Sequence, residues 1–286
     1  PGRPAVIGRF RHDLAGLMMK TPAPTVRVLG RGRMGTALTG ALSAAGWSVE
    51  ALPGRGPHVP GAAQGVSLLV LCVPDSAVAE VAAAVRPASG AALRTETGGG
   101  TGASVVAHTA GALTLEALAP HERRASLHPL VSVPAGPDSG AALRGAWMAL
   151  AGDALIGSVA AALDGQAFRV ADSDRVTYHA AAAVAANNLV ALMGQVERLA
   201  ASVGVPAEAM FELAAGALDQ VRRRGAATAL TGPVARGDWA TVAAHLEVLP
   251  SDERAAYEAL ALQALRLAWP TLHAATNQGS APPWRS

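Results

Sequence analysis

A glycine-rich turn near the start of the chain has the spacing of a phosphate-binding loop. The segment 30–35 reads Gly-Arg-Gly-Arg-Met-Gly, after the apolar run 26–29 and before the helix-compatible stretch 36–45. In such a turn the first glycine permits the bend, the second lets the backbone approach a pyrophosphate, and the third lets the helix pack on the strand. The helix start adds unpaired N–H groups and the positive end of its dipole. Unless the turn is purely structural, the predicted contacts with a dinucleotide are made by Gly30, Gly32, Arg33, Met34 and Gly35.

The second strand indicates which dinucleotide is bound. Enzymes that use NAD usually place Asp or Glu at the end of this strand, on the ribose hydroxyls. Here the strand 48–52 carries Glu50 two residues before its end and is followed by Arg55, whose planar guanidinium suits a 2′-phosphate. NADP(H) is therefore the predicted cofactor, unless Arg55 is only a solvated loop charge. Val73 and Pro74, at the carboxyl end of the next strand, are expected to contact the cofactor as well.

Two histidines end neighbouring predicted strands and could take part in proton transfer. His128 closes the strand 124–128 and precedes a proline, at the sheet edge where substrate and nicotinamide would meet. It could polarise or protonate a carbonyl group, or it could be a structural histidine at a strand end. His108 closes the strand 104–108 and is expected to line the nicotinamide pocket or to bond a backbone carbonyl.

A long Ala-rich helix, predicted over 174–203, carries polar residues that interrupt its apolar face. Asn187 and Asn188 are neutral amides, which must be hydrogen-bonded where they are buried, so one of them is expected to face a cleft between domains and to orient the substrate. His179 lies eight residues before Asn187, on roughly the same flank of the helix. It is a second candidate for the proton donor, or else a histidine packed in the core.

The elements that must position these residues change in kind along the chain. Strands are predicted at 26–29, 48–52, 67–73, 104–108, 124–128 and 146–150, with helices at 34–45, 76–85 and 113–119. Short apolar strands that alternate with helices indicate an α/β domain with a parallel sheet. After the long helix only further helices are predicted, near 206–224, 239–248 and 252–268.

The predicted fold is therefore an N-terminal Rossmann domain with a parallel sheet, followed by an all-α C-terminal domain. A glycine-rich insertion, more easily explained as a mobile loop than as a phosphate loop, lies at 86–104. The predicted limits are 1–24 for an N-terminal extension, 25–172 for the Rossmann domain, 173–270 for the helical domain and 271–286 for a flexible tail.

Composition excludes several other classes of protein. The chain has 286 residues, 51% of them hydrophobic and 15% charged, and no uninterrupted apolar run of about eighteen residues, so it is expected to be soluble and cytoplasmic, without a membrane partner. Cys72 lies in an apolar strand and is expected to be inert. Dispersed arginines and 3% aromatic residues argue against nucleic acid as a partner. Lys20 is the only lysine and precedes the first strand, which argues against Schiff-base chemistry. No metal site is predicted.

Four segments together resemble a family of oxidoreductases in which a Rossmann-like domain precedes a helical domain of unknown function. They are the glycine turn 30–35, the step Val73-Pro74-Asp75, the segment 126–130 and the segment 230–238, which is the most specific. The broader group contains ketopantoate, pyrroline-carboxylate, 6-phosphogluconate and β-hydroxyacid reductases or dehydrogenases. The resemblance, which runs from about residue 26 to residue 268, implies NADP(H) binding, and some relatives are ketopantoate reductases.

The resemblance also implies roles for single residues. In prephenate dehydrogenases a similar His-Pro step holds a reacting oxygen, which is the role implied for His128. β-Hydroxyacid dehydrogenases pair a lysine with an asparagine four residues later, but counting back from Asn187 gives Ala183, so that acid is missing. In pyrroline-carboxylate reductases a Gly-Thr loop holds the substrate carboxylate across a dimer. Thr231 and Arg236 would do so here, unless they only join two helices.

The function expected on these grounds is NADPH-dependent reduction of a small keto acid, with ketopantoate as the best single guess. Hydride transfer from the nicotinamide would be assisted by His128 acting as an acid. Reduction of an imine, or NADPH binding by a regulatory protein without catalysis, are the alternatives. The expected partners are a small carboxylate substrate and a second copy of the chain, because the Ala-rich helix suits close packing between subunits.

Overall fold

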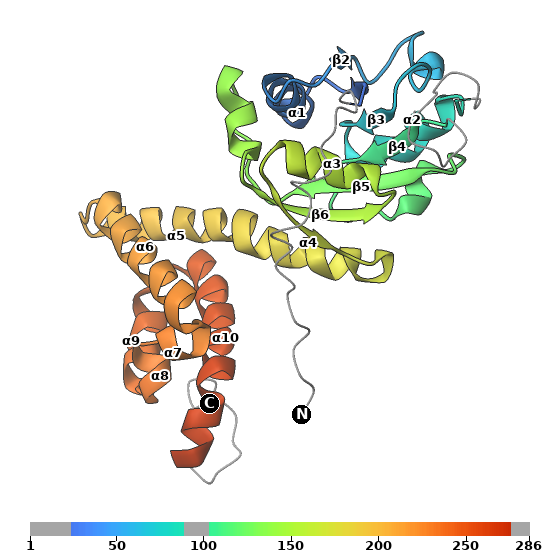
Figure 1. Cartoon of the computed structure of the whole chain (residues 1–286). Coiled ribbons are helices and arrows are strands. Elements are labelled where there is room, and N and C mark those ends of the chain that lie inside the picture. The colour runs from blue at the N-terminus through green and yellow to red at the C-terminus, as the bar shows by residue number, and fades with distance from the viewer. Residues whose placement is uncertain (1–23, 89–102, 276–286) are drawn as a thin grey trace. The chain divides into compact units, whose positions relative to one another are not determined.

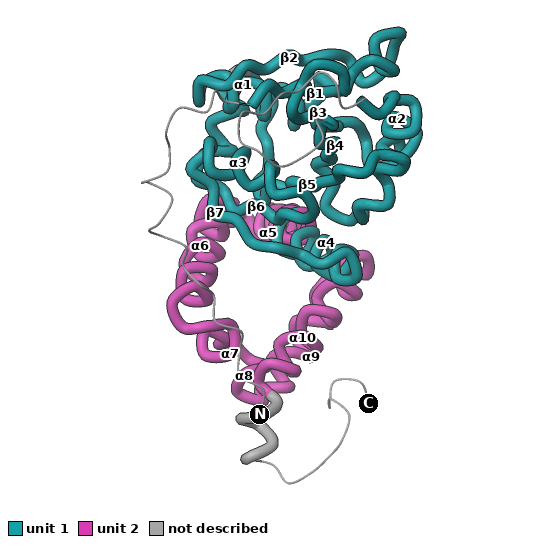
Figure 2. The backbone as a smooth tube through the Cα atoms, turned by 45° about the vertical axis from the view of Figure 1, so that its right-hand side comes forward, with its two compact units in different colours: residues 1–186 teal, residues 187–286 magenta. Residues whose placement is uncertain are grey.

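The computed structural model describes residues 24–88 and 103–275. By its internal contacts the chain divides into two compact units, residues 1–186 and 187–286 (Figure 2). The boundary predicted after residue 172 follows the change from strands to helices, whereas the contacts group the first helix after the strands with the sheet. The predictions of an extension at 1–24, an insertion at 86–104 and a tail at 271–286 fall wholly or largely outside the described residues.

Unit 1 is built on a seven-stranded sheet of order β2-β1-β3-β4-β5-β6-β7 (Figure 1). Its strands are β1 Val26–Leu29, β2 Val49–Leu52, β3 Leu68–Leu71, β4 Val105–His108, β5 Arg124–Pro129, β6 Trp147–Gly152 and β7 Gln166–Arg169. β1 pairs in parallel with β2 and β3, β3 with β4, and β4 with β5. The predicted Rossmann-type fold is confirmed, and the carboxyl ends of these five strands share one edge.

The far end of the sheet departs from a wholly parallel arrangement. β6 is antiparallel to β5, and β7, an additional strand, is parallel to β6. Within the connection from β5 to β6 lies the 3-10 turn η4, Pro137–Leu143, in place of the crossover helix that usually joins parallel neighbours. β7 has only one partly buried side chain, which makes its apolar pattern too weak to indicate a strand.

Apolar layers cover both faces of the sheet. The helices of unit 1 are α1 Arg33–Ala44, α2 Val78–Ala84, α3 Leu155–Ala162 and α4 Arg175–Ala183, and its other 3-10 turns are η1 Val59–Gly61, η2 Asp75–Ala77, η3 Leu115–Leu118 and η5 Asp172–Asp174. α1 and α3 pack with Val28 and Leu127 in one core cluster, whereas α2 packs with Leu29 and Leu71 in the other. β3 is buried along its whole length, as is typical of an inner parallel strand. The predicted helix at 113–119 is the 3-10 turn η3.

The long helix predicted over 174–203 is interrupted near its middle. α4 is followed by a π-helical turn, Val184–Asn188, and then by α5, Leu189–Ser202. By length and composition the stretch Asp172–Ser202 could cross a bilayer: it contains an 18-residue window with a mean hydropathy of 1.2, and none of that window is buried. A search for uninterrupted apolar runs misses such a helix, so the absence of a membrane partner stays a prediction.

Unit 2 is helical throughout its described residues, as predicted. After α5 it contains α6 Ala207–Arg224, α7 Ala226–Ala229, α8 Pro233–Arg236, α9 Trp239–Val248 and α10 Ser251–Ala275. Val234, Val242, Ala261 and Leu265 form its small buried core. α9 begins with a side-chain cap, because a carboxylate oxygen of Asp238 accepts a hydrogen bond from the backbone N–H at position 241.

Candidate functional site

The glycine turn has the geometry that its spacing predicts. Gly30 has a φ of +114°, and a Cβ there would overlap the carbonyl oxygen of Cys72, while a Cβ at Gly35 would overlap the carbonyl oxygen of Gly30. Nothing lies within 4 Å of the position that a Cβ of Gly32 would take. Gly32 is the N-cap of α1 and makes no side-chain cap. The first N–H groups of α1 therefore face an open position that an anion could fill.

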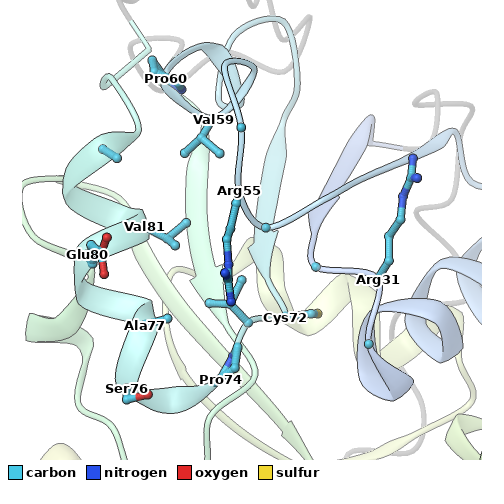
Figure 3. Close-up of a pocket in the computed structure, with 16 residues that line it drawn as sticks. Arg31, Arg55, Val59, Pro60, Cys72, Pro74, Ser76, Ala77, Glu80 and Val81 are labelled. Atoms are coloured by element: carbon cyan, nitrogen blue, oxygen red, sulfur yellow. The ribbon is translucent and has the colours of Figure 1, made fainter.

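A cavity of about 760 Å³ lies beside this turn (Figure 3). Its lining brings the glycine turn together with the loop after β2, the end of β3 and the first turns of α2. Figure 3 shows the side chain of Arg55 extending across it toward Pro74. Residues that were predicted to bind the cofactor and that line the cavity are Gly30, Gly32, Arg55, Val73 and Pro74.

Four of the predicted cofactor residues do not line this cavity. Gly35 is buried in the contact between α1 and the turn, Arg33 is exposed, and Met34 packs against the core of unit 1. His108 is buried in a separate polar cluster, described below. The cavity also contains a second cation, Arg31, whose Nη2 donates to the carbonyl oxygen of Ala51 at 3.0 Å; its place between the first two glycines is a signal that the sequence already carried.

The polar cluster lies where β4 and β5 end and α4 begins, all within unit 1. The Nδ1 atom of His128 is 2.6 Å from the hydroxyl of Tyr178, and its ring centroid is 5.6 Å from that of His179. His108 pairs in register with Ser126 across the two strands and is fully buried. The structure thus brings together three histidines that were predicted separately, and it adds Tyr178, which sequence reasoning missed although it precedes His179.

A buried arginine stands at the centre of this cluster. The side chain of Arg175 has no exposed surface, its Nε donates to Asp172 Oδ1 at 3.2 Å, and its Nη2 donates to the hydroxyl of Ser126. Asp172 in turn accepts the backbone N–H of Leu115 at 3.1 Å. Among the described residues Nη1 of Arg175, Nδ1 of His108 and Nδ1 of His179 are buried without a partner. The sequence signal for Arg175 was a single cation, beside Asp172 and Asp174, at the start of an apolar helix.

Burial and the nearby guanidinium hold His108 and His128 neutral. Burial and, to a smaller extent, the charge of Arg175 together lower the pKa of His108 to about 4, against smaller opposing contributions. Burial, and then the charges of His179 and Arg175, lower the pKa of His128 to about 4. Burial raises the pKa of Tyr178 to about 12 despite the opposing charge of Arg175. At neutral pH both imidazoles and the phenol are therefore uncharged, so His128 acts as a neutral hydrogen-bonding group rather than as an imidazolium.

Gly111 lets the loop after β4 approach two of these imidazoles. A Cβ at this position would overlap Nδ1 of His179 and would lie 3.0 Å from Nε2 of His128. The absence of a side chain lets the backbone at Gly111 come close to these ring nitrogens. By contrast Cys72 takes no part, because burial raises the pKa of its thiol to about 12, in keeping with the inert role predicted for it.

Unit 2 carries the remaining predicted site residues. Asn187 and Asn188 lie in the π-helical turn and are exposed in the described part of the chain, and the expectation that one of them faces a cleft between domains stays a prediction. Thr231 is exposed, and the Nη2 atom of Arg236 is 4.0 Å from Asp238 Oδ2 in an exposed ion pair. Their assignment to substrate binding stays a prediction. The described residues contain no cluster of metal-ligating side chains.

Comparison with known proteins supports the fold and the helical family. Residues 150–264 match the family described as "Domain of unknown function (DUF2520)". No curated protein matches the chain. Among solved structures, the chain is similar to a candidate NADP oxidoreductase from Bacteroides fragilis, with 18% identity, 85% of this chain and 98% of that chain covered, and a TM-score of 0.67.

Two further solved structures share the architecture at lower TM-scores. Pyrroline carboxylate reductase from Plasmodium falciparum, with NADP bound, is 11% identical over 86% of this chain and 98% of that chain, with a TM-score of 0.53. An imine reductase from Aspergillus terreus, in complex with NADPH4 and dibenz[c,e]azepine, is 18% identical over 86% and 95%, with a TM-score of 0.56. At these identities the likeness shows the fold: a Rossmann-type domain followed by helices, with a DUF2520 domain in the C-terminal region.

Proposed function

We propose that this protein is an NADPH-dependent oxidoreductase that reduces a small keto acid, with ketopantoate as the first substrate to test. The observation that carries the proposal is that one edge of the sheet holds both a candidate cofactor site and a candidate proton donor. The glycine turn after β1 opens on a cavity lined by Arg55. Near the end of β5, in the same sheet, His128 is hydrogen-bonded to Tyr178 of α4. Similarity to proteins described as NADP oxidoreductases or bound to NADP supports this choice of cofactor.

The residues present fit NADP(H). The open position at Gly32 and the first N–H groups of α1 would hold the pyrophosphate, and the guanidinium of Arg55 would meet the 2′-phosphate. Arg31 adds a second cation to the lining of the cavity. Ligands of open α/β sheets bind outside the carboxyl ends of the strands, which directs the other end of the dinucleotide toward β4 and β5. The reduced nicotinamide, when bound, supplies the hydride.

The polar cluster favours a carbonyl substrate over an imine. Reduction of a carbonyl places negative charge on its oxygen, which a neutral N–H of His128 and the positive charge of Arg175 would stabilise. Reduction of an iminium ion starts from a cation, which the buried charge of Arg175 disfavours. Imine reduction remains the second candidate because the chain is similar to an imine reductase; a regulatory protein that binds NADPH without turnover is the third.

The wider assignments are proposals of the same kind. Thr231 and Arg236 would bind the substrate carboxylate, and Asn187 would orient the substrate.

A second copy of the chain would cover exposed apolar side chains on α5 and α6. Val190 is 72% exposed and Leu213 is 69% exposed, and exposed apolar residues of this kind favour association. Light scattering at micromolar concentration should report a dimer; a monomer would contradict this part. The cytoplasm is the proposed location.

Calorimetric titration tests the cofactor site directly. NADPH should bind more tightly than NADH, Gly32→Asp should abolish binding by placing a carboxylate beside the pyrophosphate, and Arg55→Ala should narrow the preference for NADPH. Lys20→Ala, outside the described residues, serves as a control for a lost cation. Equal affinities for NADPH and NADH would refute the NADP assignment.

A substrate screen that follows NADPH absorbance separates the three functions. Keto acids should be reduced faster than cyclic imines at matched concentration. The opposite order would select the imine reductase. NADPH binding with no turnover on either class would leave the regulatory role.

A further inference from the structure

Two hydrogen bonds join β5 to α4 and define how the strand and the helix fit together. Arg175 Nη2 bonds the hydroxyl of Ser126, and Tyr178 bonds Nδ1 of His128 at 2.6 Å. Two residues along a strand face the same side, and three residues along a helix share a face. The contact of Arg175 with Ser126 therefore brings Tyr178 to His128. Asp172 holds the guanidinium from its other side.

The direction of the bond between Tyr178 and His128 follows from acid strength. A phenolic O–H is a far stronger acid than a neutral imidazole N–H, and the imidazole nitrogen is the stronger base. The phenol accordingly donates to Nδ1, and the ring proton of the neutral imidazole resides on Nε2. Nε2 lies against Gly111 and makes no hydrogen bond within the described residues, so its proton is available to a ligand.

We propose that Tyr178 and Arg175 are positioning residues of a proton relay that ends at Nε2 of His128. This inference rests on the reductase function proposed above. As the substrate carbonyl is reduced by hydride addition, its oxygen gains the electron pair of the C=O π bond and takes the proton from Nε2. The proton of the Tyr178 hydroxyl moves to Nδ1 at the same time. His128 stays neutral, a tyrosinate is left, and solvent returns its proton after the product leaves.

The relay leaves a tyrosinate at Tyr178 in a buried place. The positive charge of Arg175 stabilises this anion. The same charge disfavours an imidazolium at His128, which would end the relay at the wrong group. The other ionisable groups around His128 are His179 on α4, His108 on β4 and Asp172 in the turn before α4. Asp172 offsets part of the guanidinium charge, and a positive charge on His179 would disfavour an imidazolium at His128 in the same way as the charge of Arg175 does.

The first test reads the tautomer of His128 by ¹⁵N NMR on the uncomplexed protein. The resonance among the eight histidines is assigned from its loss in His128→Asn. Nδ1 should carry no proton and Nε2 should carry one, and Tyr178→Phe should shift the equilibrium toward the other tautomer. A proton on Nδ1 in the wild type would overturn the proposal. This test needs neither cofactor nor substrate, so it stands even where the reductase function fails.

The second test measures the pKa of His128 in matched variants. Arg175→Met removes the charge and should raise the pKa, whereas Ser126→Ala removes the hydrogen-bond partner, keeps the charge and should leave the pKa low. An unchanged pKa in Arg175→Met would contradict the role of the charge. Should that variant fail to fold, Arg175→Lys keeps a cation without the bond to Ser126 and should retain the low pKa; a pKa near that of a free histidine would then contradict the proposal.

The third test is kinetic and requires a verified substrate. Tyr178→Phe should lower kcat about a hundredfold, the usual scale of proton-transfer catalysis, with the Kd for NADPH unchanged. Tyr257→Phe is the control and should keep wild-type kcat. The Tyr257 hydroxyl lies 2.7 Å from Nδ1 of His245 in unit 2, in a pair similar to that of Tyr178 and His128. Wild-type kcat in Tyr178→Phe would overturn the relay while leaving the reductase function intact, whereas absence of NADPH binding in the wild type would overturn the function.

Discussion

Among its described residues the protein has two histidine–tyrosine pairs of nearly the same geometry, one in each unit. Nδ1 of His128 is 2.6 Å from the Tyr178 hydroxyl, and Nδ1 of His245 is 2.7 Å from the Tyr257 hydroxyl. The ring centroids are 5.6 and 5.7 Å apart, at interplanar angles of 86° and 87°. Geometry alone therefore does not distinguish them.

The surroundings of the two pairs distinguish them. The first pair joins a strand to a helix beside a fully buried guanidinium, whereas the second joins α9 to α10, and His245 is exposed to solvent. A hydrogen bond and a charge act more strongly in a poorly hydrated place than in water. The comparison teaches that burial and the charge of Arg175 suit the pair of unit 1 to proton transfer, whereas the pair of unit 2 only links two helices.

The largest expected effect separates the two histidines. His128→Asn should lower kcat about a hundredfold or more on a verified substrate, because the N–H that meets the reacting oxygen is displaced. NADPH affinity, measured by calorimetry, should survive. His245→Asn is the matched change and should keep wild-type kcat. Equal kcat values for the two variants would show that the difference in surroundings has no effect on catalysis.

A smaller effect is expected from a methyl group placed against the first pair. Gly111→Ala inserts a Cβ that overlaps His179 and crowds His128, so kcat should fall roughly tenfold, the cost of about 1.4 kcal/mol. Gly216→Ala, in an exposed position of α6 with nothing within 4 Å of the added Cβ, should instead stabilise unit 2 by about 0.5–1 kcal/mol. Steady-state kinetics and chemical denaturation check the two outcomes.

The pH dependence of stability should also reflect the first pair. The pKa of His128 is about 4 in the folded chain against 6.5 for an ordinary histidine, so between these values the unfolded chain binds more protons. Stability is then fully present above about pH 6.5 and is lost as the pH falls toward 4. His128→Asn should flatten this part of the curve in denaturation experiments at stepped pH. A curve unchanged by the substitution would show that the imidazole is not held neutral by folding.

The smallest effect is expected beside the second pair. Hydrogen bonds from Thr241 lower the pKa of Asp238, and its carboxylate caps α9. Asp238→Ala should lower the melting temperature slightly by removing the cap, without changing kcat or the tautomer of His128. A lower kcat in this variant would place Asp238 in the chemical step and would weaken the contrast between the pairs.

Local features of the molecule were predictable from the sequence. The glycine turn and the first five strands depend on residues within a few positions of each other, so spacing and residue type suffice. The far end of the sheet was not predictable in the same way: the orientation of β6 depends on how its connection folds, and β7 presents too little apolar surface to be seen. Whether Asn187 faces a cleft between domains depends on what packs against the helix, so that expectation stays a prediction.

The sequence by itself determined a dinucleotide-type turn, a sheet that carries His108 and His128 at one edge, and a helical second part, because each follows from a local pattern. Only the tertiary structure decided which histidine has a phenol as its partner and which arginine is buried beside it. Tyr178 is 50 residues from His128, and Arg175 is 49 residues from Ser126. Contacts across such distances arise from packing, and the energetics of a buried charge depend on everything that excludes water from it, which no local pattern records.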